Sequence, residues 1–170
     1  MDSVVVTDQA APLAISFGGV STGPVYKNTL EVLWRDPRRA KWSAGHIQIP
    51  RRRWMFRVLQ RGSSIWLFGG FHAGEKGTHE FPRPVLQFDV SSKEPSFRPT
   101  TLRMPESRFG FAAASLANKF YFIGGMQSAG KLSKTCHVFD PKTGKWSTVA
   151  APRRARFQPQ VVVFNQRLFL

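Results

Sequence analysis

The stretch Phe120-Tyr121-Phe122-Ile123-Gly124-Gly125 has two earlier counterparts, Ile65-Trp66-Leu67-Phe68-Gly69-Gly70 and Leu13-Ala14-Ile15-Ser16-Phe17-Gly18-Gly19. Each is a short apolar run that ends in paired glycines. The runs are too short for helices and rich in aromatic and β-favouring residues, so they predict buried strands. The pairs recur at intervals of 51 and 55 residues, which indicates an internal structural repeat.

A second marker, an aspartate after a strand-like segment, recurs in step with the glycines. Asp36, Asp89 and Asp140 are separated by 53 and 51 residues. In the first and last copies the aspartate begins an Asp-Pro turn, and a tryptophan follows six residues later, at Trp42 and Trp146. An aspartate in such a turn can accept hydrogen bonds from backbone N–H groups. The middle copy has Asp-Val, so we expect a different turn there.

The third marker is an arginine that lies 16 residues before a glycine pair. Arg53 precedes Gly69 and Arg108 precedes Gly124 by this interval, and each follows a proline by three residues. The segment Pro152-Arg153-Arg154-Ala155-Arg156 is a looser third copy, in which Arg154 is the candidate. Three markers in a fixed order, at a period of about 50 residues, form a specific signal.

This pattern resembles the kelch repeat over essentially the whole chain. The resemblance implies an all-β fold, a kelch-type β-propeller in which each repeat forms one four-stranded blade. We expect blades near residues 1–45, 46–100 and 101–150, and the opening hairpin of the next blade in 151–170. Three blades and a hairpin cannot close a ring of four to eight blades. The sequence therefore predicts an incomplete propeller and a chain that is part of a longer protein.

The composition is globular, with 42% hydrophobic and 21% charged residues in 170. The single cysteine, Cys136, excludes an internal disulfide framework and a zinc site built on several thiolates. We expect a small buried thiol there. No apolar run approaches the roughly 20 residues that span a bilayer. We expect a cytoplasmic or nuclear location.

Charge is the unusual property of the chain. Lys and Arg number 25 and Asp and Glu number 10, which gives a net charge of +15. A surface this basic attracts acidic protein segments, nucleic acid or anionic membrane, and the charge alone does not choose among them. No nucleic-acid-binding motif is visible in the sequence.

The titratable residues do not form a catalytic or metal-binding pattern. The recurring aspartates would lie about a blade apart in a propeller, so they cannot act as a carboxylate pair. His72 and His79 share one loop, but their spacing matches no compact ligand motif. We therefore expect no enzymatic activity, no cofactor and no metal. The alternative left open is a fragment of a kelch-like enzyme whose site lies in missing blades.

The arginines are the first functional candidates. Loops between blades emerge on one face of a propeller, and kelch propellers that bind acidic peptide segments use arginines from these loops. The resemblance therefore implies partner-binding roles for Arg53, Arg108 and Arg154. Guanidinium groups pair well with carboxylates. The alternative is that these are structural arginines of the repeat, packed on aromatic residues such as Trp54 or Phe109.

The loops after the glycine pairs, residues 20–29, 71–84 and 126–135, are the second candidates, because variable loops on a regular scaffold usually carry specificity. The middle loop contributes His72 and Arg83 to the predicted partner-binding residues.

The predicted function is non-enzymatic protein–protein interaction, with an acidic segment of a partner as the ligand. By resemblance, the module would recognise substrates for a cullin-type ubiquitin ligase or bind the actin cytoskeleton. The adaptor role requires BTB and BACK helical domains, and neither is visible in the sequence. A basic surface for nucleic acid or anionic membrane is the alternative function.

Overall fold

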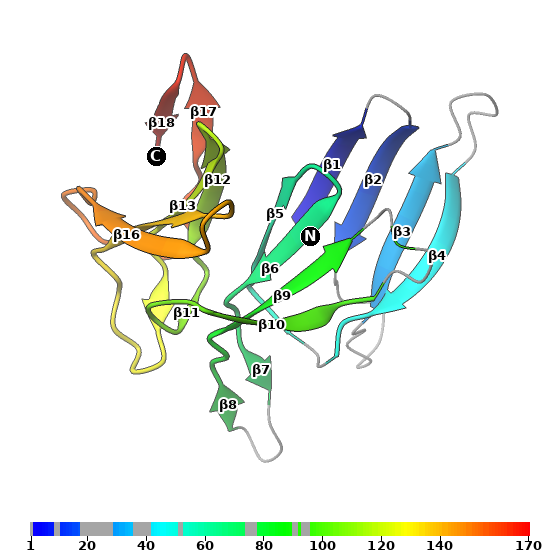
Figure 1. The fold of residues 1–170 in the computed structure, drawn as a ribbon. Coiled ribbons are helices and arrows are strands. Elements are labelled where there is room, and N and C mark those ends of the chain that lie inside the picture. Colours follow the sequence, from blue (N-terminus) through cyan, green and yellow to red (C-terminus); the bar gives the residue numbers. More distant parts are fainter. Residues whose placement is uncertain are drawn as a thin grey trace.

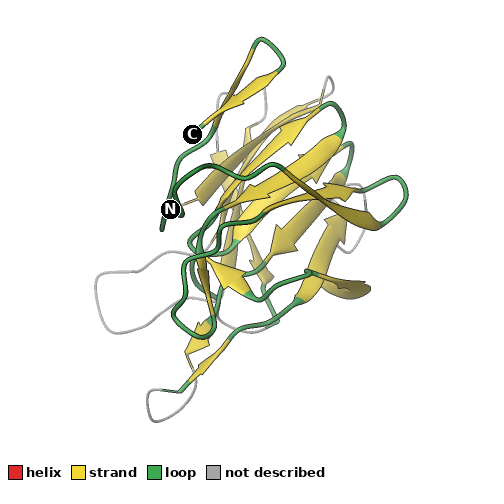
Figure 2. Ribbon diagram, turned by 90° about the vertical axis from the view of Figure 1, so that its left-hand side faces the viewer, coloured by secondary structure: helices red, strands yellow, loops and turns green. Residues whose placement is uncertain are grey.

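The computed structural model describes residues 2–8, 11–17, 29–35, 42–50, 53–73, 78–89, 92 and 96–170. Every regular element in these ranges is a β-strand (Figure 2). None of the described residues forms a helix long and apolar enough to cross a membrane. The glycine pair 18–19, Asp36 and residues 51–52 lie outside the described residues.

Three antiparallel four-stranded sheets follow one another along the chain. The first contains β1 (Asp2–Asp8), β2 (Ala11–Phe17), β3 (Thr29–Arg35) and β4 (Trp42–Gln48). The second contains β5 (Arg57–Arg61), β6 (Ser64–Phe68), β9 (Pro84–Asp89) and β10 (Arg98–Arg103). The third contains β12 (Ala112–Leu116), β13 (Lys119–Ile123), β15 (Cys136–Asp140) and β16 (Lys145–Val149). In each sheet the hydrogen-bonded neighbours follow chain order.

Three smaller strand pairs complete the described fold. The hairpin of β17 (Val162–Phe164) and β18 (Arg167–Phe169) follows the third sheet. The pair β7 (His72–Ala73) and β8 (His79–Glu80) projects from the second sheet, and β11 (Arg108–Phe109) pairs with β14 (Met126–Gln127). The first strands of successive sheets are neighbours: β5 lies against β1 and β12, and β12 lies against β17 (Figure 1).

Among the residues whose burial is described, a hydrophobic core lies between the second and third sheets. Phe68 on β6 is fully buried, and its ring centroid lies 4.7 Å from that of Phe122 on β13. Trp146 on β16 packs against Phe139 in its own sheet, at 4.8 Å, and against Phe68 in the neighbouring sheet, at 6.2 Å. Removing a buried Phe or Trp side chain typically costs about 3–5 kcal/mol. This aromatic contact therefore fixes the two sheets against each other.

The Asp-Pro turn after β15 shows how the second sequence marker works. The Asp140 carboxylate accepts a hydrogen bond from the Lys142 N–H at 2.8 Å, and the Asp140 carbonyl accepts one from Gly144 at 2.8 Å. The hydrogen bond from the Lys142 backbone lowers the pKa of Asp140. In the turn after Asp89 the donor lies three residues on instead of four: the Ser92 N–H donates to the Asp89 carbonyl at 3.3 Å.

Candidate interaction face

Three connectors join the sheets, and they repeat one backbone geometry. Residues Met55, Gly110 and Gln158 all adopt left-handed conformations, with φ of 52°, 57° and 50°. The Gly110 N–H donates to the Met55 carbonyl at 3.1 Å, and the Gln158 N–H donates to the Gly110 carbonyl at 2.8 Å. The connectors are therefore hydrogen-bonded in series, and positions in one connector can be matched to positions in the next.

Each described glycine pair docks on the following connector. The Gly70 N–H donates to the Arg108 carbonyl at 2.9 Å, and the Gly125 N–H donates to the Arg156 carbonyl at 2.8 Å. All four glycines of the two pairs have positive φ, and a Cβ added at Gly124 would stand 2.8 Å from the Arg156 carbonyl oxygen. The paired glycines are required because the chain turns left-handed against another backbone there.

This docking identifies the third arginine of the repeat. Arg156, rather than Arg154, occupies the position equivalent to Arg108, because both carbonyls accept from the second glycine of the preceding pair. The sequence alone does not distinguish the two residues, because the third copy contains three arginines. Arg154 lies in the same connector, with an exposed side chain.

The predicted partner-binding residues divide into buried and exposed groups. Arg53 and Arg108 are 7% and 0% exposed, and His72 is 5% exposed. Arg83 and Arg154 are exposed. Burial of Arg53 and Arg108 favours the alternative reading, in which they are structural arginines of the repeat. Arg53 Nη1 donates to the Gly69 carbonyl at 3.3 Å and so holds its own glycine pair.

Arg108 is the centre of a buried polar network. Its Nη2 donates to the Glu106 carboxylate at 2.7 Å and lies 3.0 Å from His137 Nδ1. The same nitrogen contacts the Thr135 hydroxyl, and Nη1 donates to the carbonyls of Phe122 and Thr135, both at 3.3 Å. Burial lowers the pKa of Arg108, and Glu106 opposes this shift. A charge without solvent exposure requires such partners.

Glu106 ties the loop after the third glycine pair to the connector. Besides Arg108, its carboxylate accepts hydrogen bonds from Gln127 Nε2 at 2.9 Å and from the Ser133 hydroxyl at 3.2 Å. Burial alone would raise the pKa of Glu106, but the hydrogen bonds from Gln127 and Arg108 outweigh it and lower the pKa. The carboxylate is therefore ionised and orders residues 126–135.

The loop after the second glycine pair is also held to the connectors by backbone bonds. Trp54 and Phe71 exchange two N–H···O bonds of 2.9 Å. The Met104 N–H donates to the Arg83 carbonyl at 2.9 Å, while Arg83 Nε donates to the Met104 carbonyl at 2.7 Å. We call this side of the molecule the connector face. It consists of residues 53–56, 71–73, 78–83, 104–111, 126–135 and 150–159.

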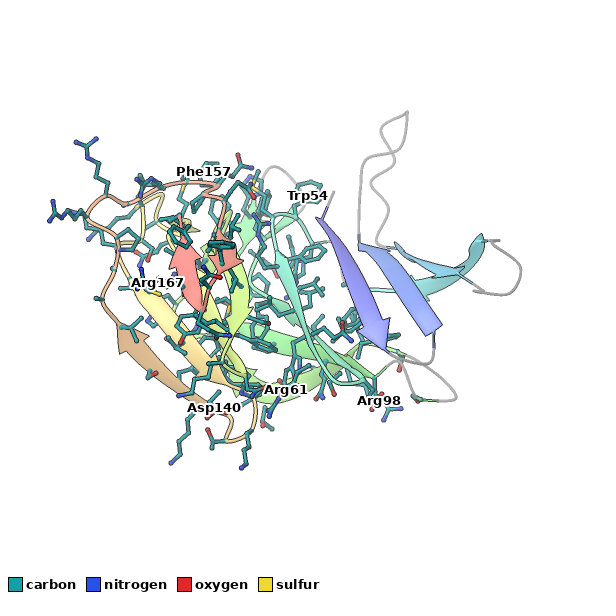
Figure 3. The ribbon with its side chains drawn as sticks, turned by 90° about the horizontal axis from the view of Figure 1, so that it is seen from above. Trp54, Arg61, Arg98, Asp140, Phe157 and Arg167 are labelled. Carbon is teal, nitrogen blue, oxygen red and sulfur yellow. The ribbon has the colours of Figure 1, made fainter. Side chains whose placement is uncertain are left out.

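Five aromatic side chains form a continuous row on the connector face. Phe71 contacts Trp54 and Phe109, both at ring-centroid distances of 5.2 Å. Phe109 also contacts Phe81 at 5.4 Å and Phe157 at 5.8 Å. We call these five residues the aromatic row. Figure 3 shows Trp54 and Phe157, the two ends of the row, on the same side of the molecule, with Arg61, Arg98 and Asp140 toward the opposite side.

Sequence reasoning considered Trp54 and Phe109 only as packing partners for arginines. A signal for three members of the row was nevertheless present, because Trp54, Phe109 and Phe157 each follow the repeat arginine directly. The other two, Phe71 and Phe81, come from the loop 71–84, and the residue equivalent to Phe71 in the next repeat is Met126, which pairs with Phe109 as Phe71 pairs with Trp54. Only the folded chain shows that they join the same row.

Comparisons with known proteins agree with this architecture. Residues 3–170 match the family described as the KLHDC2/KLHL20/DRC7 Kelch-repeats domain. Alpha-scruin of Limulus polyphemus is 22% identical over 148 residues, which cover 85% of this chain and 16% of that protein. The Kelch repeat-containing protein kel-10 of Caenorhabditis elegans is 27% identical over 173 residues, which cover 97% of this chain and 28% of that protein.

The chain thus spans less than a third of the length of these two relatives. Among solved structures it is similar to that of YjhT, with a TM-score of 0.66 and 16% sequence identity over 89% of this chain and 51% of that one. At this identity the likeness shows the fold alone. Together with the three successive sheets, it confirms the predicted propeller architecture in incomplete form.

Proposed function

Because this chain belongs to the kelch-repeat family, we propose that it is a non-enzymatic protein-interaction module that binds an acidic segment of a partner on its connector face. The observation that carries the proposal is the set of exposed arginines on this face. They are Arg83, Arg153, Arg154 and Arg156. Their charges belong to a chain of net charge +15, which favours approach of an acidic ligand.

The buried arginines have a supporting role in this proposal. Arg53 donates to Gly69, just before the loop that carries Arg83, and Arg108 holds Glu106 and Thr135 in the next connector and loop of the same face. His72 is buried and belongs to the short β7–β8 pair, where it is paired with Glu80. A rigid arrangement reduces the entropy lost when the partner binds.

The family leaves two cellular roles for such a module. Kelch propellers recognise substrates for cullin-type ubiquitin ligases, and others bind actin filaments. Either role would place this chain in the cytoplasm or nucleus as part of a larger protein. In both roles the propeller supplies recognition of a protein surface, which is the activity proposed here.

The test compares two double variants of matched charge. Arg83→Ala with Arg154→Ala removes two exposed arginines from the connector face, and Arg61→Ala with Arg98→Ala removes two exposed arginines from the opposite side. Acidic peptides selected from a random twelve-residue display library on the parent chain serve as probes. Each charge-assisted hydrogen bond contributes about 1.5 kcal/mol or more. The first variant should therefore bind about a hundredfold more weakly, and the second should bind nearly as the parent does.

Two results would contradict this proposal. If the selected peptides were not enriched in Asp and Glu, the proposal that the ligand is acidic would be wrong. Equal losses in the two variants, with an affinity that falls steeply with salt for any polyanion, would leave the alternative of a generally basic surface for nucleic acid or anionic membrane.

A further inference from the structure

We propose that the aromatic row is the docking site for one bulky apolar side chain of the acidic partner segment. This inference rests on the proposed function and adds a second requirement to the ligand. The partner would be an extended peptide that carries a Phe, Leu or similar anchor between Asp or Glu residues. The anchor would lie on the row while the acids meet the arginines beside it.

The row is separate from the core that holds the sheets together. The buried cluster between the second and third sheets contains Phe68, Phe111 and Phe122, and no member of the row belongs to it. Four members are half-buried and Phe157 is 38% exposed. Contiguous apolar surface that the core does not use marks an interaction site in soluble proteins.

The exposed end of the row has a fixed position. The Phe157 ring lies directly over Gly110, where an added Cβ would collide with ring carbon Cε2. Gly110 also has a φ of 57°, a conformation that glycine adopts without strain. The ring thus occupies the space that a side chain at residue 110 would take. A fixed ring offers contact area at low entropic cost.

The ring geometry favours an apolar side chain over a nucleic-acid base. The contacts of Phe71 with Trp54 and with Phe109 have interplanar angles of 75° and 65°, and the Phe109–Phe157 angle is 77°. In these three contacts the edge of one ring meets the face of the next, whereas Phe81 is tilted by 33° against Phe109 and by 38° against Phe71. Base stacking needs a free ring face, as in single-strand binding proteins. An aliphatic or phenyl group can instead pack against edges and faces together.

Charge complementarity argues for acidic residues beside the anchor. Arg83 follows Phe81 by two residues, and Arg156 immediately precedes Phe157. Among the described residues of the connector face, the exposed acid is Glu80, next to Phe81. Within this described part, four exposed arginines and one exposed glutamate leave an excess of positive charge around the row. The occupant that matches both properties is an acidic peptide with an apolar anchor.

The experiment uses the peptides selected on the full 170-residue chain. Each acidic peptide is resynthesised with its bulky apolar residue replaced by Ala. We expect the replacement to weaken binding to the parent about tenfold, in line with the loss of one packed ring contact. Phe81→Ala with Phe157→Ala should bind the original and the Ala peptide equally and weakly. Phe164→Ala, which removes a more exposed ring on the β17–β18 hairpin, should behave as the parent.

The outcomes separate this inference from the proposed function. Acidic peptides that bind without preference for an apolar residue would overturn the anchor and leave the acidic ligand intact. A failure to select acidic peptides would overturn both. Displacement of the peptide by a short poly(U) strand that needs the same rings would assign the row to nucleic acid. The single variant Phe157→Ala, which should lose less stability than the double variant, keeps the test valid if the double variant unfolds.

Discussion

Arg108 and Arg156 occupy the same position in consecutive repeats, yet one guanidinium is enclosed by protein and the other is exposed. Both carbonyls accept the N–H of a docked glycine, Gly70 for the first and Gly125 for the second. The Arg108 side chain is fully buried and makes an ion pair of 2.7 Å with Glu106. The Arg156 side chain is exposed, and its recorded hydrogen bond, of 3.5 Å, goes to the Arg154 carbonyl.

The residue two places earlier is one cause of this difference. It is Glu106 before Arg108 and Arg154 before Arg156, so the first arginine has a carboxylate beside it and the second a like charge. The other partners of Arg108, Thr135 and His137, follow it by 27 and 29 residues. The repeat register fixes the backbone position, while neighbouring side chains decide whether an arginine is enclosed by protein or exposed to solvent.

The strongest test of this comparison is removal of each arginine in turn. Arg108→Ala should lower the free energy of unfolding by about 3–5 kcal/mol, because the Glu106 carboxylate loses its buried partner. Arg156→Ala should change it by no more than about 0.5 kcal/mol, as exposed positions do. Urea denaturation followed by tryptophan fluorescence measures both. Similar losses in the two variants would show that Arg156 has buried partners of its own.

The next largest loss of stability is expected at Gly110, against which the ring of Phe157 packs. Gly110→Ala should lower stability by about 2–4 kcal/mol, which combines the strain of a left-handed alanine with displacement of Phe157. Gly62→Ala is the matched control, because Gly62 has the same φ of 57° and no atom within 4 Å of an added Cβ. It should lose only about 1–2 kcal/mol. Equal losses would mean that the Phe157 ring moves away freely.

Much of the fold could be predicted from the sequence, because glycine pairs and alternating apolar runs report local backbone geometry. The run before Gly69 is β6, the run before Gly124 is β13, and the fold class that follows from them is confirmed. Trp146 also packs across to Phe68 of the neighbouring sheet, as a marker of blade packing should.

The candidate site was less predictable, because burial depends on residues far apart in the sequence. The register of Arg108 fits a partner-binding role and a structural role equally, and the partners that enclose it are Glu106 and His137 of β15. Arg83 and Arg154 were proposed from loops and are exposed. Register alone could not distinguish these cases, since a guanidinium has the same charge in both.

A smaller loss of stability is expected when Glu106, the ion-pair partner of Arg108, is replaced. Glu106→Gln keeps the shape and an acceptor oxygen but removes the charge, so we expect a loss of about 1–2 kcal/mol, the difference between a charge-assisted and an ordinary hydrogen bond. The reverse exchange, Arg154→Glu, places a carboxylate two residues before Arg156. It should leave the urea midpoint nearly unchanged. A clear gain in stability would show that the carboxylate alone is sufficient to enclose Arg156.

The smallest expected effect is a pH dependence of the same network. Burial lowers the pKa of His137, and the positive charge of Arg108 lowers it further. In the unfolded chain His137 has an ordinary pKa of about 6.5. The unfolded state therefore binds a proton more readily, and the contribution of His137 to stability is present above about pH 6.5 and declines as the pH falls below it. The lowered pKa of Glu106 adds a second loss of stability only below about pH 4.5.

Urea midpoints at about pH 7.5 and 5.5 should show a decrease in the parent and a smaller one in His137→Asn, whose amide oxygen can still accept from Arg108. His79→Asn, at an exposed position, should keep the decrease of the parent. A parent that is equally stable at both pH values would mean that His137 binds a proton as readily in the folded network as in the unfolded chain.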